Sequence, residues 1–177
     1  MKSIETKRFI LLPVELTDAE NIYRILSNEK VIENLNMDIH KTIEDTTNLI
    51  NKYLDGLNKK TMFPYKIIDK VTGEFIGVYL NKIDLYDDDC FEFTIYLSEE
   101  YWGRGIYSEV LPYMINQAFE VIKTGNYRGF VMEKNIASRK VLEKSNMKLE
   151  KVFSVPGINE PIYSFLITKE EWCQLNK

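Results

Sequence analysis

The chain is poor in cysteine and histidine. Its 177 residues include two cysteines, Cys90 and Cys173, and one histidine, His40. Two cysteines are too few for the disulfide framework of a small secreted domain, which favours a reducing compartment such as the cytoplasm. A lone histidine without a cysteine pair provides no ligand set with metal spacing. We therefore expect no bound metal, and we interpret His40 as an ordinary surface residue.

Long apolar runs and an excess of positive charge are also absent. No stretch approaches the roughly 20 apolar residues that a membrane-spanning helix needs. The first eight residues lack the apolar segment of a signal peptide. The formal net charge of -4 argues against a protein that binds nucleic acid through bulk charge. We expect a cytoplasmic protein without membrane or nucleic-acid partners, and a homodimer is one assembly that the sequence allows.

What is present indicates one globular α/β domain over residues 1–177. Hydrophobic residues make up 45% and charged residues 28% of the chain, as in soluble globular proteins. Apolar periodicity and turn residues predict strands at residues 6–14, 63–69, 74–84, 91–97, 127–133, 147–155 and 161–167. They predict helices at 17–27, 42–57, 108–123 and 135–146, and a short terminal helix after Thr168. This order predicts a mixed, mainly antiparallel, twisted sheet flanked by helices.

The most informative stretch joins a predicted strand to a predicted helix at residues 92–109. Apolar residues alternate along the strand, which indicates a half-buried strand with Phe91, Phe93, Ile95 and Leu97 on its buried face. Gly103 and Gly105 stand between strand and helix. Glycines there let main-chain N–H groups turn outward at a helix N-terminus, where they suit a phosphate. A plain tight turn is the alternative, and the glycine spacings of the two commonest nucleotide loops are absent.

This stretch resembles the acyl-CoA pyrophosphate loop of the GNAT N-acetyltransferase superfamily, in its RimJ/RimL-like branch. The branch reads E-I-G-Y-x-L, a short turn, then Y-W-G-x-G-Y/I-A-S/T-E, and the matching residues are Glu92, Tyr101, Trp102, Gly103, Gly105, Ser108 and Glu109. The branch also opens T-x-R-L-x-L-R before an aspartate, which Thr6, Arg8, Leu12 and Asp18 fit loosely. Tyr107 replaces a small residue and is expected to reshape the loop, and Pro112 should bend the helix.

A second stretch, residues 133–147, indicates a short helix capped by Asn135, with Asn146 in the left-handed position after its end. It also resembles the second GNAT motif, N-x-x-S-x-x-V/L/I-L/Y-E-K-x-G-F. The matching residues are Asn135, Ser138, Val141, Leu142, Glu143 and Lys144. Two motifs in the right order are more specific than either one. The resemblance runs from Thr6 to about Leu166 but is dense only in these two motifs.

The resemblance implies acetyl-CoA as co-substrate and a primary amine as acceptor, with direct transfer in a ternary complex. The pyrophosphate would bind main-chain N–H groups in the segment formed by Trp102, Gly103, Arg104, Gly105, Ile106, Tyr107 and Ser108. The pantetheine arm would pair with the main chain of Ile95, Tyr96 and Leu97, and would contact Asn135, with Ser138 nearby. Main-chain N–H groups of that strand would also polarise the thioester carbonyl.

The resemblance implies a general base but not a general acid. Glu92 occupies the recurrent glutamate position and is the candidate general base, with a glutamate satisfied by a neighbour or by solvent as the alternative. Many superfamily members have a tyrosine as general acid where this chain has Leu142, so Ser138 is the nearest replacement and Tyr96 a second one. A covalent route through Cys90 lacks an activating base and is the least favoured.

The acceptor stays open at this point. It is a protein N-terminal α-amine or a small-molecule amine, because the RimJ/RimL-like branch includes enzymes for both. Segments 28–41 and 156–161 are expected to form its pocket, and neither carries a diagnostic motif. A non-catalytic acyl-CoA-binding or sensing module is the alternative function, since Tyr107 and Leu142 depart from the family pattern.

Overall fold

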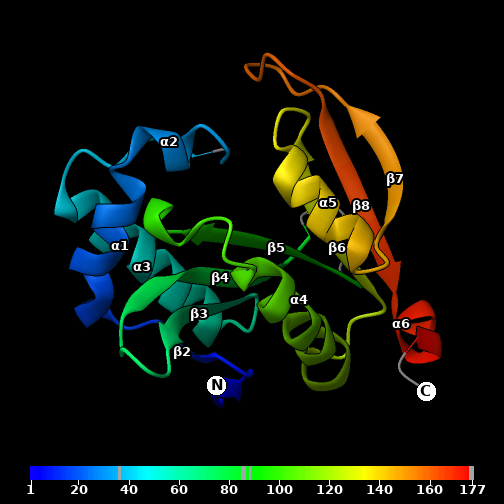
Figure 1. The fold of residues 1–177 in the computed structure, drawn as a ribbon, viewed down its shortest axis with the longest axis horizontal. Coiled ribbons are helices and arrows are strands. Elements are labelled where there is room, and N and C mark those ends of the chain that lie inside the picture. Colours follow the sequence, from blue (N-terminus) through cyan, green and yellow to red (C-terminus); the bar gives the residue numbers. More distant parts are fainter. Residues whose placement is uncertain (36, 85–86, 88, 176–177) are drawn as a thin grey trace. The chain divides into compact units, whose positions relative to one another are not determined.

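The structure of the chain is a computed structural model that describes residues 1–35, 37–84, 87 and 89–175. It contains two compact units, which we describe one at a time. The first unit comprises residues 1–82 and 94–110, and the second comprises residues 83–93 and 111–177. Strand β5 (Cys90–Leu97) and helix α4 (Ile106–Gln117) contribute residues to both units (Figure 1). One domain over residues 1–177 stays a prediction.

The first unit is an antiparallel sheet with helices. Its strands are β1 (Ile4–Glu5), β2 (Phe9–Pro13), β3 (Met62–Asp69), β4 (Phe75–Ile83) and the end of β5. Its helices are α1 (Ala19–Leu26), α2 (Glu29–Ile32), α3 (Ile43–Asn58) and the start of α4. Each strand from β1 to β4 pairs with the next in antiparallel register. The N–H of Ser98 donates to the carbonyl of Ile76 (2.9 Å), which ties the end of β5 to β4.

Helices α1, α2 and α3 pack against β4 and β5 in the core of this unit. The buried members of this core are Val14, Ile22, Ile25, Leu26, Val31, Ile50, Tyr53, Val78, Leu80 and Tyr96. Tyr96 is 2% exposed although its position was predicted on the polar face of the strand. The prediction of a half-buried strand is therefore wrong, because Phe91 and Phe93 on the opposite face are buried as well.

Gly77 allows β4 and β5 to approach each other closely. A Cβ atom at this position would lie 2.2 Å from the carbonyl oxygen of Tyr96 and 2.9 Å from Cα of Leu97. Any larger residue would therefore displace the main chain of β5. This is the strand segment that the family resemblance assigns to the pantetheine arm.

The second unit is a mixed sheet. Residues Cys90–Phe93 of β5 pair in parallel with β6 (Asn126–Met132). Strand β6 pairs antiparallel with β8 (Ile162–Thr168), and β8 pairs antiparallel with β7 (Lys148–Phe153). The helices are the end of α4, α5 (Ile136–Lys144) and α6 (Lys169–Leu175). The ring of Phe93 stacks on that of Tyr127, with centroids 5.2 Å apart, and Phe119 meets Tyr127 edge-on.

The strand order confirms the predicted fold class. Because β5 is shared, the strands follow the order β1-β2-β3-β4-β5-β6-β8-β7 in an eight-stranded sheet, in which β5–β6 is the parallel pair. The fold is mixed α/β, with a mostly antiparallel sheet flanked by helices. The short elements β1 and α2 were not predicted. Within the described ranges, no helix is both long and apolar enough to cross a membrane.

Several local predictions can be compared with the structure. The helix predicted from Thr17 begins two residues later, at Ala19, because a 3-10 turn at Leu16–Asp18 precedes α1, and the carboxylate of Asp18 accepts a hydrogen bond from the N–H of Glu15. Asn146 has the expected left-handed φ of 62°. Pro112 lies inside α4 without ending it. A π-helical turn, Ala118–Ile122, follows, and the residue after it, Lys123, is left-handed with a φ of 68°.

An acidic run at residues 87–89 directly precedes β5. Asp88 lies outside the described residues. Asp89 contributes to packing, because its carbonyl accepts a hydrogen bond from the hydroxyl of Thr124 (2.6 Å) and its carboxylate accepts one from the N–H of Gly125 (2.7 Å). A Cβ atom at Gly125 would lie 2.2 Å from that carboxylate, so glycine is required there by close packing rather than by its φ.

Candidate functional site

The glycine-bearing loop of the first unit leads directly into α4. Gly103 and Gly105 have φ angles of +73° and +72°, in the left-handed region that favours glycine. Helix α4 begins at Ile106, and the N–H of Glu109 donates to the carbonyl of Gly105 (3.1 Å). The N–H groups of the first helical turn have no partner within the helix, and they lie at the positive end of its dipole. The loop is exposed and therefore fits an anionic group such as a pyrophosphate.

Trp102 fastens the start of this loop to the end of β5. Its indole N–H donates to the carbonyl of Leu97 (3.0 Å), and its main-chain N–H donates to the carbonyl of Glu99 (3.1 Å). The guanidinium of Arg104 lies over the ring of Tyr101, 5.1 Å from its centroid. The loop is thus anchored through Trp102, while Gly103, Arg104 and Gly105 stay exposed.

Glu109 anchors the other side of the loop. One carboxylate oxygen accepts hydrogen bonds from the hydroxyl of Thr6 (2.6 Å) and the N–H of Arg8 (2.7 Å). The other oxygen pairs with Nε of Arg8 at 2.6 Å. Burial opposes ionisation of this carboxyl, but the bonds from Thr6 and Arg8 outweigh it and hold its pKa below the ordinary value. The only sequence signal for this contact is that Thr6, Arg8 and Glu109 all match the family pattern.

Tyr107, the departure from the family pattern, is partly buried. Burial raises the pKa of its hydroxyl, which therefore stays neutral. Helix α4 still begins at Ile106 and includes Tyr107 and Ser108 in its first turn. The helix start that provides the outward N–H groups is thus retained with a tyrosine at this position.

The main-chain N–H and C=O groups at the end of β5 point alternately toward β4 and away from it. Ser98 donates to Ile76 on β4, and the polar groups of successive strand residues point to opposite edges. Those of Ile95 and Leu97 therefore face away from β4, whereas those of Tyr96 face it. The side chain of Tyr96 lies in the core, where burial raises the pKa of its hydroxyl well above the ordinary value. This buried position disfavours Tyr96 as a proton donor.

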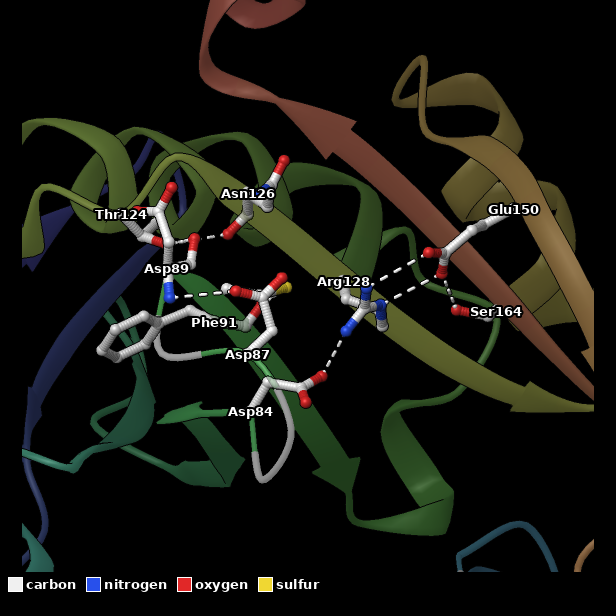
Figure 2. Close-up of polar contacts among 10 residues, drawn as sticks. Asp84, Asp87, Asp89, Phe91, Thr124, Asn126, Arg128, Glu150 and Ser164 are labelled. Carbon is white, nitrogen blue, oxygen red and sulfur yellow. Dashed lines mark hydrogen bonds and ion pairs between the residues drawn. The ribbon is translucent and has the colours of Figure 1, made fainter.

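In the second unit, Glu92 is buried and pairs in register with Arg128 of β6. Side chains of register partners project from the same face of a sheet. Figure 2 shows Arg128 between two carboxylates, those of Asp84 and Glu150. Its Nε lies 3.1 Å from Glu150, whose carboxylate also accepts a hydrogen bond from the hydroxyl of Ser164 (2.7 Å). This cluster was not predicted from the sequence.

Ionisation states in the cluster follow from its geometry. Burial opposes ionisation of Glu150, but bonds from Ser164 and Arg128 outweigh it and hold its pKa below the ordinary value. Burial likewise opposes the charge of Arg128, yet Glu150 and Asp84 raise its pKa overall. The thiol of Cys90 is fully buried, and burial raises its pKa to about 12. A neutral, enclosed thiol is a poor nucleophile, which argues against a covalent route through Cys90.

Asn135 caps α5 as predicted. Its side-chain oxygen accepts a hydrogen bond from the N–H of Ser138 (3.1 Å). Because the oxygen is used in the cap, the amide NH2 is the group oriented to donate elsewhere. Ser138 is partly buried on the first turn of α5. Leu142 is 1% exposed, and its side chain lies 3.4 Å from where a Cβ atom of Gly129 would be, so it packs in the core.

Of the two segments expected to form the acceptor pocket, 156–161 lies within the described residues, and so does 28–41 apart from Asn36. Residues 37–41, together with Asp45 and Asn48, line a hollow of about 460 Å³. His40 is partly buried rather than fully at the surface; its Nδ1 lies 2.7 Å from Oγ1 of Thr46, and burial lowers its pKa. In the second unit, Glu160 accepts a hydrogen bond from the N–H of Lys134 (2.9 Å). Among the residues that the structure describes, no group of three metal-ligating side chains is found.

Comparisons with known proteins agree with this fold. A family model, the acetyltransferase (GNAT) domain, matches residues 8–148. An uncharacterized N-acetyltransferase, p20, of Bacillus licheniformis is 24% identical over 98% of this chain and 99% of that protein. RimL, a ribosomal alpha-N-protein acetyltransferase solved with coenzyme A, superposes with a TM-score of 0.83 at 15% identity, covering 96% of this chain and 99% of that one. Spermidine N-acetyltransferase of Vibrio cholerae, solved with CoA and spermine, superposes with a TM-score of 0.81 at 15% identity, covering 94% and 98%.

Proposed function

Because this chain belongs to the GNAT acetyltransferase family, we propose that it is an N-acetyltransferase that moves an acetyl group from acetyl-CoA to a primary amine by direct transfer. The observation that carries the proposal is the loop at residues 103–108. Two glycines with positive φ stand before the first turn of α4, in register with the family's pyrophosphate motif.

Acetyl-CoA supplies an acetyl group activated as a thioester. The proposed pyrophosphate ligands are the main-chain N–H groups from Gly103 to Ser108, which the exposed glycine positions and the helix dipole support. The N–H of Trp102 already donates to the carbonyl of Glu99, so we assign Trp102 the role of anchoring the start of this loop. The proposed partners of the pantetheine arm are the main chain from Ile95 to Leu97 and the side-chain NH2 of Asn135. The outward direction of the groups of Ile95 and Leu97 supports the first, and the capping bond of Asn135 supports the second.

The acceptor amine must lose a proton before it attacks, because an ammonium group has no lone pair. A lysine-like amine has a pKa of about 10.4, whereas an α-amino group has one of about 7.7–8.0. We assign the general base to Glu92, acting directly or through a water molecule. Its burial on β5, beside the charged cluster of Arg128, supports a carboxylate with a defined position.

The leaving thiolate needs little help, since a free thiol has a pKa of about 8.5. We assign the proton donor to Ser138, because Leu142 is packed in the core and Tyr96 is buried in the first unit. The buried, neutral thiol of Cys90 supports direct attack of the amine over an acetyl-cysteine intermediate.

For the acceptor we propose a protein N-terminal α-amine or a small-molecule amine, as in the RimJ/RimL-like branch. RimL, an alpha-N-protein acetyltransferase, and spermidine N-acetyltransferase share the fold. Because each is only 15% identical to this chain, both acceptor classes should be tested in the same assay. Once the acceptor class is known, we propose to substitute residues that line the hollow, such as Asp38, His40 and Asp45, to test whether it binds the acceptor.

Replacing Glu92 by glutamine should lower kcat by about 100-fold, because a positioned base contributes about 10²–10⁴ to the rate. The dissociation constant for acetyl-CoA should change by less than about threefold, since glutamine has nearly the same shape. Steady-state kinetics and calorimetry measure the two quantities. Glu20→Gln makes the same chemical change at an exposed position on α1 and should leave both quantities unchanged. Turnover equal to that of the unsubstituted protein would remove Glu92 from the mechanism.

A further inference from the structure

Arg8 joins two points of the glycine-bearing loop that are far from it in the sequence. It lies between β1 and β2, and its Nε pairs with the Glu109 carboxylate at 2.6 Å. Its Nη1 donates to the carbonyl of Arg104 at 2.9 Å, and its main-chain N–H donates to Glu109 at 2.7 Å. The guanidinium therefore reaches the loop on one side of Gly105 and the first turn of α4 on the other.

This contact restrains the part of the loop that is freest to move. Glycine has more accessible backbone conformations than any other residue, so a loop with two glycines is not rigid by itself. The Arg104 carbonyl and the Glu109 carboxylate stand on either side of Gly105. A planar guanidinium that binds both at once fixes their separation, which a single-point ammonium cannot do.

The charge balance indicates bracing rather than direct phosphate binding. The positive charge of Arg8 is paired with the carboxylate of Glu109, which also accepts a hydrogen bond from the hydroxyl of Thr6, with the two oxygens 2.6 Å apart. Glu109 lies in the first turn of α4, where the helix dipole favours a negative charge. The outward N–H groups of the loop are left as the groups that meet the anion.

We infer that Arg8 is a positioning residue: it orders the loop at residues 103–108 before acetyl-CoA binds, and it takes no part in the chemistry. The inference rests on the proposed function, because it presumes that this loop holds the pyrophosphate. Groups held in place before binding lose less freedom when the ligand arrives, so affinity rises without any new contact to the ligand.

The test separates acetyl-CoA affinity from turnover. Arg8→Met should raise both Kd and KM for acetyl-CoA by about 10- to 100-fold, the size of effect that small misplacements produce. The kcat at saturating acetyl-CoA and the KM for the amine should change by less than about threefold, because the reacting groups are untouched. Arg8→Lys retains the positive charge but not the planar guanidinium that donates to two groups at once. Its affinity for acetyl-CoA should therefore lie between those of Arg8→Met and the unsubstituted protein.

Lys59→Met is the matched control. It removes an ion pair of the same length, 2.6 Å to Asp55, from the exposed side of α3, and it should leave all four constants unchanged. A merely structural role for Arg8 would lower the folded fraction and hence kcat, with KM for acetyl-CoA unchanged, and that pattern overturns the inference. If Arg8→Met fails to fold, the same comparison of KM for acetyl-CoA with kcat is made on Arg8→Lys. If the unsubstituted protein fails to bind acetyl-CoA, it is the proposed function that falls.

Discussion

Gly105→Glu should raise the Kd for acetyl-CoA by more than about 100-fold, as expected when like charges meet in a closely fitted contact. The new carboxylate would stand beside the N–H groups proposed to meet the pyrophosphate. It would also lie near Arg8, whose Nη2 is 3.8 Å from the position of the new Cβ atom, and would compete with Glu109 for it. Calorimetric titration with acetyl-CoA measures the change.

A matched control is available in the same unit. Gly73, in the turn between β3 and β4, has a φ of +74° against +72° for Gly105, and a Cβ atom there would meet nothing within 4 Å. Gly73→Glu therefore carries the same backbone strain, about 1–2 kcal/mol, and the same charge, at a position where no atom of the loop lies within 4 Å of the new Cβ. Its acetyl-CoA affinity should equal that of the unsubstituted protein. Equal affinity in the Gly105 variant would show that this loop does not hold the pyrophosphate.

Arg128→Met should lower the free energy of unfolding by about 3–5 kcal/mol, because it removes the cation that neutralises the buried carboxylate of Asp84. The side chain of Asp84 is 3% exposed and that of Arg128 is 11% exposed. Methionine fills similar space but cannot neutralise Asp84 or donate to Glu150. Chemical denaturation followed by circular dichroism measures the change.

Two further variants isolate the reason for this loss. Asp84→Asn combined with Arg128→Met removes both charges of the buried pair and should recover part of the stability. Lys59→Met breaks an exposed ion pair and should cost no more than about 1 kcal/mol. A cost for Arg128→Met as small as that of Lys59→Met would mean that the cluster around Arg128 contributes little to folding.

Features set by local sequence were predicted well. Asn135 as helix cap, Asn146 in the left-handed position and Thr168 at the start of α6 each depend on neighbours within a few residues, and the structure confirms each. Failures arose where tertiary packing decides. Tyr96 looked polar by alternation but is covered by the helices of the first unit, and the close approach of Asp89, which requires glycine at position 125, has no signal in the local sequence.

The charged contacts of the site region show the same limit. Arg8 and Glu109 are separated by 101 positions, and Arg128 binds Asp84 and Glu150, which lie 44 and 22 positions away. No periodicity or spacing links residues so far apart. Arg8 and Glu109 both match the family pattern, but the pattern did not predict that they contact each other. Nothing in the sequence singled out Asp84, Arg128 or Glu150.

The role of residues 103–108 is best measured by acetyl-CoA-dependent thiol release across a panel of amines: N-terminal peptides, polyamines, aminoglycosides and free amino acids. We expect release with one class of amine, an acetylated product by mass spectrometry, and loss of release in Gly105→Glu but not in Gly73→Glu. Absence of both thiol release and acetyl-CoA binding in the unsubstituted protein would show that residues 103–108 do not hold the pyrophosphate of an acetyl donor.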